Sequence, residues 1–244
     1  MVVTCVLVHG IRTSRTMWRA QCEYLAEHGI PAVAIDLPGH GQRRDEEFTL
    51  AGALAVIDHA VRDAASAGPV LLVGHSMGGL LSTAYAGSPE HPPVAGLIGA
   101  SCTALPRGRG LALYRLLARG FNALPGQGEW ISRRVIAATL PPETRGDFGA
   151  GGYAHAAQDV ALASLAELEL LRAIVRLRIP TWWINGALDQ LRLQEDLFTR
   201  LSPHSELIVV PRTTHLLPAM RPEVFNALLR LAAATLQQNA DAES

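Results

Sequence analysis

Short apolar runs alternate along the chain with longer amphipathic segments. The apolar runs predict strands near residues 2–9, 31–36, 70–75, 94–100, 180–186 and 205–211. The amphipathic segments predict helices near residues 16–28, 49–66, 77–87, 191–201 and 221–238. Strands that alternate with helices at this spacing indicate the α/β class. We expect a doubly wound, mostly parallel sheet of about six strands with helices on both faces.

The third apolar run ends in Gly74-His75-Ser76-Met77-Gly78, and a helical pattern follows at once. Glycines two residues before and after Ser76 permit the sharp strand-to-helix turn that displays a serine hydroxyl above a sheet. The N-terminus of the following helix favours developing negative charge. Ser76 is therefore a candidate nucleophile, although Gly-x-Ser-x-Gly also occurs in ordinary turns. The side chain of His75 is expected to point away from Ser76 and to pack.

A nucleophilic serine needs a base and a third group that orients the base. Asp189 follows the strand pattern of residues 180–186, and His215 follows that of residues 205–211. Because the carboxyl ends of parallel strands share one edge of a sheet, Ser76, Asp189 and His215 should meet there. Taken alone, Asp189 and His215 are more often a turn former and a loop residue. The combination favours a catalytic triad.

Acyl transfer also needs two preorganised amide donors for the oxygen of the tetrahedral intermediate. The first strand closes in His9-Gly10, and the backbone N–H of Ile11 in the next loop is one candidate donor. The N–H of Met77, directly after Ser76, is the other. The alternative interpretation of His9-Gly10 is a simple turn before a helix.

These segments resemble the α/β-hydrolase superfamily. The matching pieces are Leu7-Val8-His9-Gly10, Asp36-Leu37-Pro38-Gly39-His40-Gly41, Gly74-His75-Ser76-Met77-Gly78-Gly79, Gly186-Ala187-Leu188-Asp189 and Thr214-His215. The resemblance implies Ser76 as nucleophile, His215 as general base and then acid, and Asp189 as orienting carboxylate. Ile11 and Met77 match the positions of the amide donors. The resemblance also implies that the hydrolytic step uses no metal or organic cofactor.

The His-Gly strand lies almost at the start of the sequence, so we expect the sheet to lack the first two strands of the superfamily. This start resembles the small plant methyl-ester esterases and hydroxynitrile lyases. The same scaffold therefore also performs lyase chemistry, and the fold alone does not decide the reaction.

The strand pattern stops between about residues 102 and 178, where Leu111–Phe121 and Ala156–Val175 have helical patterns. We predict a core of residues 1–101 and 179–244, with residues 102–178 inserted as a helical cap like that of the superfamily. A cap would exclude water and supply an apolar pocket wall. Its candidate lining residues, each with cap packing as the alternative, are Tyr114, Phe121, Trp130, Ile131, Tyr153 and His155.

Several residues beside the predicted triad are candidate substrate contacts. Trp18 resembles the tryptophan that often follows the His-Gly loop in the superfamily, and core packing is its alternative role. Arg12 and Arg15 are candidates to meet a substrate carboxylate, the alternative being a solvated loop. Leu216, next to His215, would make the surroundings apolar, which suits an uncharged acyl chain.

Composition and charge limit the binding partners, the location and the kinds of site that we expect for this protein. The 244 residues are 49% hydrophobic, which suits buried parallel strands, and the formal charge of −1 gives no electrostatic case for nucleic acid or a membrane surface. No apolar stretch approaches the ~20 residues that span a membrane, and the N-terminus lacks a leader pattern, so we predict a cytoplasmic protein. The three cysteines and nine histidines show neither a disulfide framework nor metal-ligand spacing.

We therefore predict a cofactor-independent serine hydrolase, monomeric or homodimeric, that cleaves a carboxylic ester of a small or medium apolar molecule. The same triad also permits hydrolysis of a thioester, lactone, amide or carbon–carbon bond, or a lyase reaction. A ligand-sensing receptor or accessory protein on the hydrolase scaffold is the alternative outside the enzymes.

Overall fold

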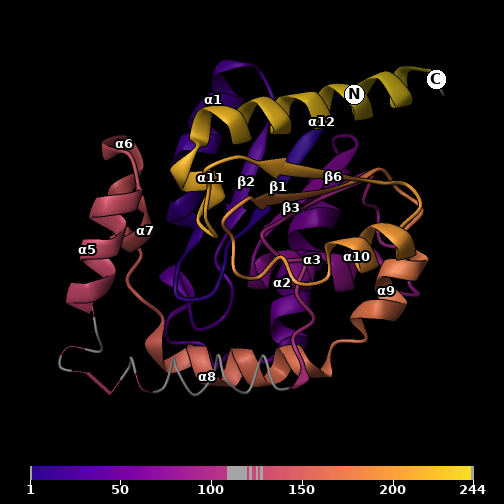
Figure 1. Ribbon diagram of the computed structural model, residues 1–244. Coiled ribbons are helices and arrows are strands. Elements are labelled where there is room, and N and C mark those ends of the chain that lie inside the picture. The colour runs from indigo at the N-terminus through magenta and orange to yellow at the C-terminus, as the bar shows by residue number, and fades with distance from the viewer. Residues whose placement is uncertain (1, 109–119, 121–122, 125, 127–128, 243–244) are drawn as a thin grey trace.

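A single parallel sheet forms the centre of the computed structural model, which describes residues 2–108, 120, 123–124, 126 and 129–242. The described strands run in the order β2-β1-β3-β4-β5-β6 (Figure 1). Their bounds are β1 Thr4–Val8, β2 Ala32–Ile35, β3 Val70–His75, β4 Gly96–Ala100, β5 Thr181–Gly186 and β6 Ser205–Val210. The prediction of a parallel sheet of about six strands is confirmed.

The order of the strands creates one switch point in the sheet. After β1 the chain adds β2 on one side, and then returns past β1 to add β3 and the later strands on the other. Ligand sites of open α/β sheets lie at the carboxyl ends of the strands that flank such a point. The loops that follow β1 and β3 carry Ile11 and Ser76, so two predicted site residues lie at this position.

Helices cover both faces of the sheet (Figure 1). One face packs against α1 (Arg19–Glu27) and α12 (Pro222–Ala242), and the other against α2 (Leu50–Ala65) and α3 (Met77–Ala86). Side chains that alternate along β1 divide between the two layers: Val6 and Val8 face α2 and α3, whereas Cys5 and Leu7 face α1 and α12. Both faces of the central strands β1, β3, β4 and β5 are therefore buried, which explains why these strands are continuous apolar runs.

The segment between β4 and β5 contains helices and no strand in its described part. These helices are α5 (Glu129–Thr139), α6 (Pro142–Arg145), α7 (Asp147–Ala150), α8 (His155–Ser164) and α9 (Leu170–Arg176). The predicted helix over Leu111–Phe121, with Tyr114 and Phe121, lies outside the described residues except for Gly120. The helical pattern of residues 156–175 forms two helices, because a 3₁₀ turn at Leu165–Glu167 separates α8 from α9. Helices α5 to α7 were not predicted.

The inserted helices fall into two groups. Helices α5, α6 and α7 lie together at one edge of the molecule (Figure 1). In contrast, α8 contributes Ala161 and Leu162 to the core beside α3, and α9 contacts α3 directly. Two further helices lie outside the inserted segment: α10 (Glu195–Leu201) follows β5, and the short α11 (Leu217–Met220) follows the loop after β6. No helix in the described part of the chain has the length and apolar composition needed to cross a membrane.

Candidate active site

Ser76 occupies the sharp turn between β3 and α3. Its φ of 53° and ψ of −116° lie in a region that residues other than glycine rarely adopt. The Ser76 N–H donates to the carbonyl of Ala100 at 2.8 Å, which anchors the turn to the end of β4. A Cβ at Gly74 would lie 2.4 Å from the Gly78 carbonyl oxygen, and a Cβ at Gly78 would lie 2.4 Å from that of Val8. The turn therefore requires glycine on both sides.

Three side chains form one hydrogen-bonded line at this edge of the sheet. Nε2 of His215 lies 2.9 Å from Ser76 Oγ, and Nδ1 lies 3.1 and 3.0 Å from the two carboxylate oxygens of Asp189. The structure thus brings together the three residues that the order of the strands predicted. With Nδ1–H donating to Asp189, Nε2 is the nitrogen that can accept the serine proton.

The two ends of the Asp189–His215 hydrogen bond differ in their exposure to solvent. The Asp189 side chain is completely buried, whereas that of His215 is 18% exposed. Burial by itself would raise the pKa of the Asp189 carboxyl. The hydrogen bond and charge of His215 and the Leu191 N–H outweigh burial and hold this pKa below its ordinary value. Asp189 is therefore a carboxylate at neutral pH and can hold the ring of His215 in one orientation.

The loop after β1 holds one peptide group in a defined direction. The Gly10 carbonyl accepts hydrogen bonds from His9 Nδ1 and from Thr13 Oγ1, both at 2.8 Å. His9 Nε2 accepts the Leu37 N–H at 3.1 Å, and burial lowers the pKa of His9, so its ring is neutral. In a trans peptide the N–H points opposite to the carbonyl. The N–H of Ile11 is therefore turned away from His9 and Thr13.

The side chain of His75 connects this loop to His215. Its Nε2 donates to the backbone carbonyl of His215 at 2.8 Å. A Cβ on Gly10 would lie 2.7 Å from His75 Nδ1, so the ring also rests against the loop after β1. Burial lowers the pKa of His75 to about 3, which keeps the ring neutral. His75 was expected to pack, and it also makes a hydrogen bond to a loop 140 residues away, which the motif around Ser76 does not encode.

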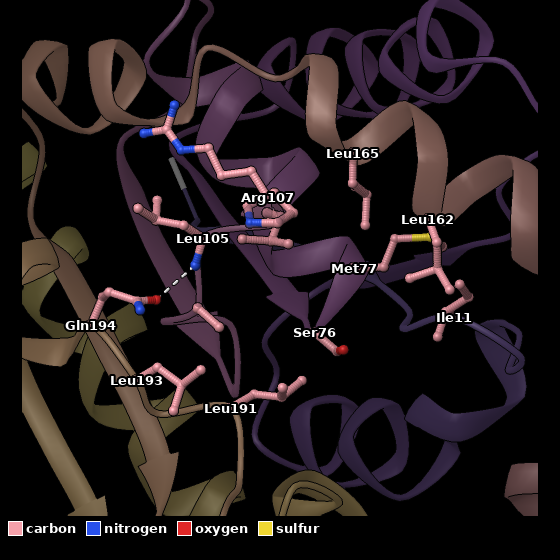
Figure 2. Close-up of a pocket in the computed structure, with 13 residues that line it drawn as sticks. Ile11, Ser76, Met77, Leu105, Arg107, Leu162, Leu165, Leu191, Leu193 and Gln194 are labelled. Atoms are coloured by element: carbon pink, nitrogen blue, oxygen red, sulfur yellow. Dashed lines mark hydrogen bonds between the residues drawn. The ribbon is translucent and has the colours of Figure 1, made fainter. Parts of the chain in front are cut away.

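A cavity of about 350 Å³ opens beside Ser76, and we call it the first cavity. Its lining is mostly aliphatic, and the guanidinium of Arg107 points away from Ser76 (Figure 2). The Leu105 N–H donates to Gln194 Oε1 at 2.8 Å, which ties the loop after β4 to the loop after β5 (Figure 2). The full lining is Ile11, Ser76, Met77, Leu80, Ala104, Leu105, Pro106, Arg107, Leu162, Leu165, Leu191, Leu193 and Gln194.

A second cavity, of about 300 Å³, also borders Ile11. It is bounded by α5, by the loop after β1 and by the residue that follows His215. Its lining is Ile11, Arg12, Thr13, Ile131, Ser132, Val135, Ile136, Phe148, Tyr153 and Leu216. Ile11 is the residue that both linings share.

Residues 5–228 match the alpha/beta hydrolase family. The chain belongs to this family. It is similar to the pimeloyl-[acyl-carrier protein] methyl ester esterase of Xanthomonas oryzae pv. oryzae, with 28% identity over 232 residues, 86% of this chain and 87% of that protein.

Two other curated relatives match over only about a third of their own length. One is the (E)-2-((N-methylformamido)methylene)succinate hydrolase of Acinetobacter baylyi, 36% identical over 83 residues, which cover 32% of this chain and 30% of that protein. Among solved structures, a thermophilic esterase from Thermogutta terrifontis superposes with a TM-score of 0.75 at 24% identity and covers 96% of this chain and 90% of that one. This last similarity supports the fold.

Three of the predicted substrate contacts reach a cavity. Arg12, Tyr153 and Leu216 all line the second cavity. Ile131, predicted to line the cap pocket, also lies there, whereas the side chain of Trp130 is 52% exposed and lines neither cavity.

The other predicted contacts lie elsewhere. Trp18 is completely buried and stacks on Phe225 at 5.9 Å between ring centroids, so it takes the core-packing alternative. His155 lies beside Tyr153 and 3.8 Å from a Glu129 carboxylate oxygen, and it lines neither cavity. The N–H of Arg15 donates to Asp36 at 2.7 Å, and its guanidinium lies 3.6 Å from the same carboxylate.

The aliphatic wall of the first cavity of this alpha/beta hydrolase was not predicted. Leu191 and Leu193 follow Asp189, and Leu105 follows β4. These residues, like Asp189, lie beyond the carboxyl end of a strand, so the same signal could have found them. Leu162 and Leu165 have no such signal, because α8 and the 3₁₀ turn after it reach the cavity only through the packing of the inserted segment.

Proposed function

We propose that this protein is a serine hydrolase that cleaves carboxylic esters of small or medium apolar acids through an acyl-enzyme. The observation that carries the proposal is the continuous line from Ser76 Oγ through His215 to Asp189, at distances of 2.9 and 3.0 Å. Family membership and similarity to an esterase over most of the chain support it. The aliphatic first cavity beside Ser76 supports an uncharged acyl chain.

In the proposed reaction, His215 Nε2 accepts the hydroxyl proton as Ser76 Oγ attacks the ester carbonyl carbon. The carbonyl oxygen becomes an oxyanion that accepts hydrogen bonds from the N–H groups of Ile11 and Met77. His215 then donates its proton to the alcohol oxygen, the carbon–oxygen bond breaks, and the acyl group stays on Ser76. A water molecule gives a proton to His215 and attacks the acyl-enzyme, and the acid leaves as Ser76 recovers its proton.

The arrangement of the loops supports the assigned donors. Met77 is the first residue of α3, so its N–H has no partner within the helix and lies next to the nucleophile. The Ile11 N–H has its direction set by the two hydrogen bonds to the Gly10 carbonyl. Both residues line the cavity that contains Ser76. Each donor of this kind contributes about 3 kcal/mol to the transition state.

The proposal is tested by replacing Ser76 with Ala and measuring the hydrolysis of p-nitrophenyl butyrate. We expect turnover to fall by roughly 10⁴-fold or more, with an unchanged thermal melting curve. Ser82→Ala is the matched control, because Ser82 lies on α3, is completely buried and lines neither cavity. A fluorophosphonate should label Ser76 alone. Wild-type turnover in Ser76→Ala, or labelling elsewhere with Ser76 unmodified, would show that the nucleophile is wrong.

A further inference from the structure

The two cavities share one lining residue, which belongs to the candidate site. Ile11 borders both, and its N–H is the proposed oxyanion donor. Ser76 and Met77 line the first cavity, whereas Leu216, the residue directly after His215, lines the second. Space therefore adjoins the candidate site both next to Ser76 and next to the residue that follows His215.

An ester has two chains that diverge from its carbonyl carbon. The acyl chain stays bonded to that carbon throughout the reaction, so it needs space next to Ser76. The alcohol chain departs with the oxygen that receives the proton from His215. That oxygen has to lie near His215 Nε2, and the chain attached to it therefore extends along the side of the site formed by His215 and Leu216.

We propose that the second cavity is the binding site for the alcohol part of the ester, and that the first cavity holds the acyl chain. This assignment rests on the proposed function. The second cavity has apolar walls from Ile131, Val135, Ile136, Phe148 and Leu216. Its volume of about 300 Å³ corresponds to roughly ten water-sized groups, so a methyl group leaves most of it empty. The preferred leaving group is thus a bulky apolar alcohol, such as hexanol or benzyl alcohol.

The chain offers matched positions at which each cavity can be filled without disturbing the core. Leu193 lines the first cavity and is 64% exposed, and Val135 lines the second and is 49% exposed. Leu231 on α12 is 59% exposed and lines neither cavity. A Trp at an exposed position adds volume without overpacking buried neighbours. Leu193→Trp, Val135→Trp and Leu231→Trp therefore form a set of two blocking variants and one control.

The experiment measures kcat/KM of the full chain on two ester series. One series keeps the p-nitrophenyl group and varies the acid from acetate to octanoate. The other keeps butyrate and varies the alcohol from methanol to benzyl alcohol, with acid release followed by titration. We expect Leu193→Trp to lower the octanoate-to-acetate ratio at least tenfold and to leave the benzyl-to-methyl ratio unchanged. Val135→Trp should do the reverse, and Leu231→Trp should change neither ratio.

The use of ratios within one variant removes any general loss of activity. If Val135→Trp changes the acyl ratio and Leu193→Trp changes the alcohol ratio, the assignment is reversed and the proposal is wrong. It is also wrong if wild-type protein hydrolyses esters but neither ratio responds to Val135→Trp. If the wild-type protein hydrolyses no ester in either series and no fluorophosphonate reacts with Ser76, the proposed function itself fails.

Discussion

Replacing His75 with Phe should slow catalysis although the residue is not expected to touch the substrate. The change removes the N–H that donates to the His215 carbonyl at 2.8 Å and keeps a ring of similar shape against Gly10. Because burial lowers the pKa of His75 to about 3, the ring carries no charge at neutral pH. The substitution therefore tests the hydrogen bond and not an electrostatic effect on the base.

The size of the effect follows from this one hydrogen bond. A neutral hydrogen bond contributes about 1 kcal/mol net if water replaces the lost donor, and about 3 kcal/mol if the carbonyl stays dry. If the whole of this free energy serves to hold His215 in its reactive position, its loss lowers kcat by roughly 5- to 150-fold. The KM should change little, because His75 lines neither cavity.

The assay compares kcat and KM for p-nitrophenyl butyrate in wild type, His75→Phe and His75→Gln. Gln retains an N–H that can reach the same carbonyl, so it should recover part of the lost kcat. The rate at which a fluorophosphonate labels Ser76 should fall in parallel with kcat, because both depend on the same base. A His75→Phe variant with wild-type kcat, or one in which only thermal stability drops, would refute the positioning role.

Two further outcomes are expected. Thr13→Val removes one of the two hydrogen bonds to the Gly10 carbonyl, so the Ile11 N–H is less firmly held and kcat should fall about 5-fold. Thr13→Ser keeps the hydroxyl and should retain activity. Equal kcat in both variants would contradict this role. In acid, His9 and His75 are neutral when folded, because burial lowers their pKa below the ordinary value of 6.5, to about 3 for His75. Between about pH 3 and 6.5 the unfolded chain therefore binds more protons than the folded chain. The free energy of unfolding consequently decreases as the pH falls below 6.5, by up to about 1.4 kcal/mol per pH unit for each ring. Melting temperatures from pH 7.5 to 5 should show this loss, with a shallower slope in His75→Phe than in wild type, and a flat profile would exclude it.

The nucleophile turn could be predicted because its signals are local. Gly74 and Gly78 lie two residues from Ser76, and each approaches a backbone oxygen to a distance at which no side chain fits. The meeting of Asp189 and His215 was predictable for a different reason. Parallel strands place their carboxyl ends on one edge, so the loops after β5 and β6 converge whatever the details of packing.

The inserted helices could be predicted only in part. Helices α6 and α7 have four residues each, so their sequences are too short to show a helical periodicity. Helix α5 buries none of its residues, unlike the predicted helices α1, α2, α3, α10 and α12. The separation of α8 from α9 occurs at Leu165, a core residue, and depends on what that side chain packs against.

The sequence by itself determined the class of fold, the strand-to-helix turn at Ser76 and the identity of the two partners that reach it. These features depend on residue spacing and on the geometry common to every parallel sheet. The tertiary structure decided that His75 bonds the His215 carbonyl, 140 residues away, and that Trp18 stacks in the core. It also decided that Ile11 lines two cavities. Such contacts join side chains distant along the chain, and their geometry depends on the packing of whole elements, which periodicity and short motifs do not encode.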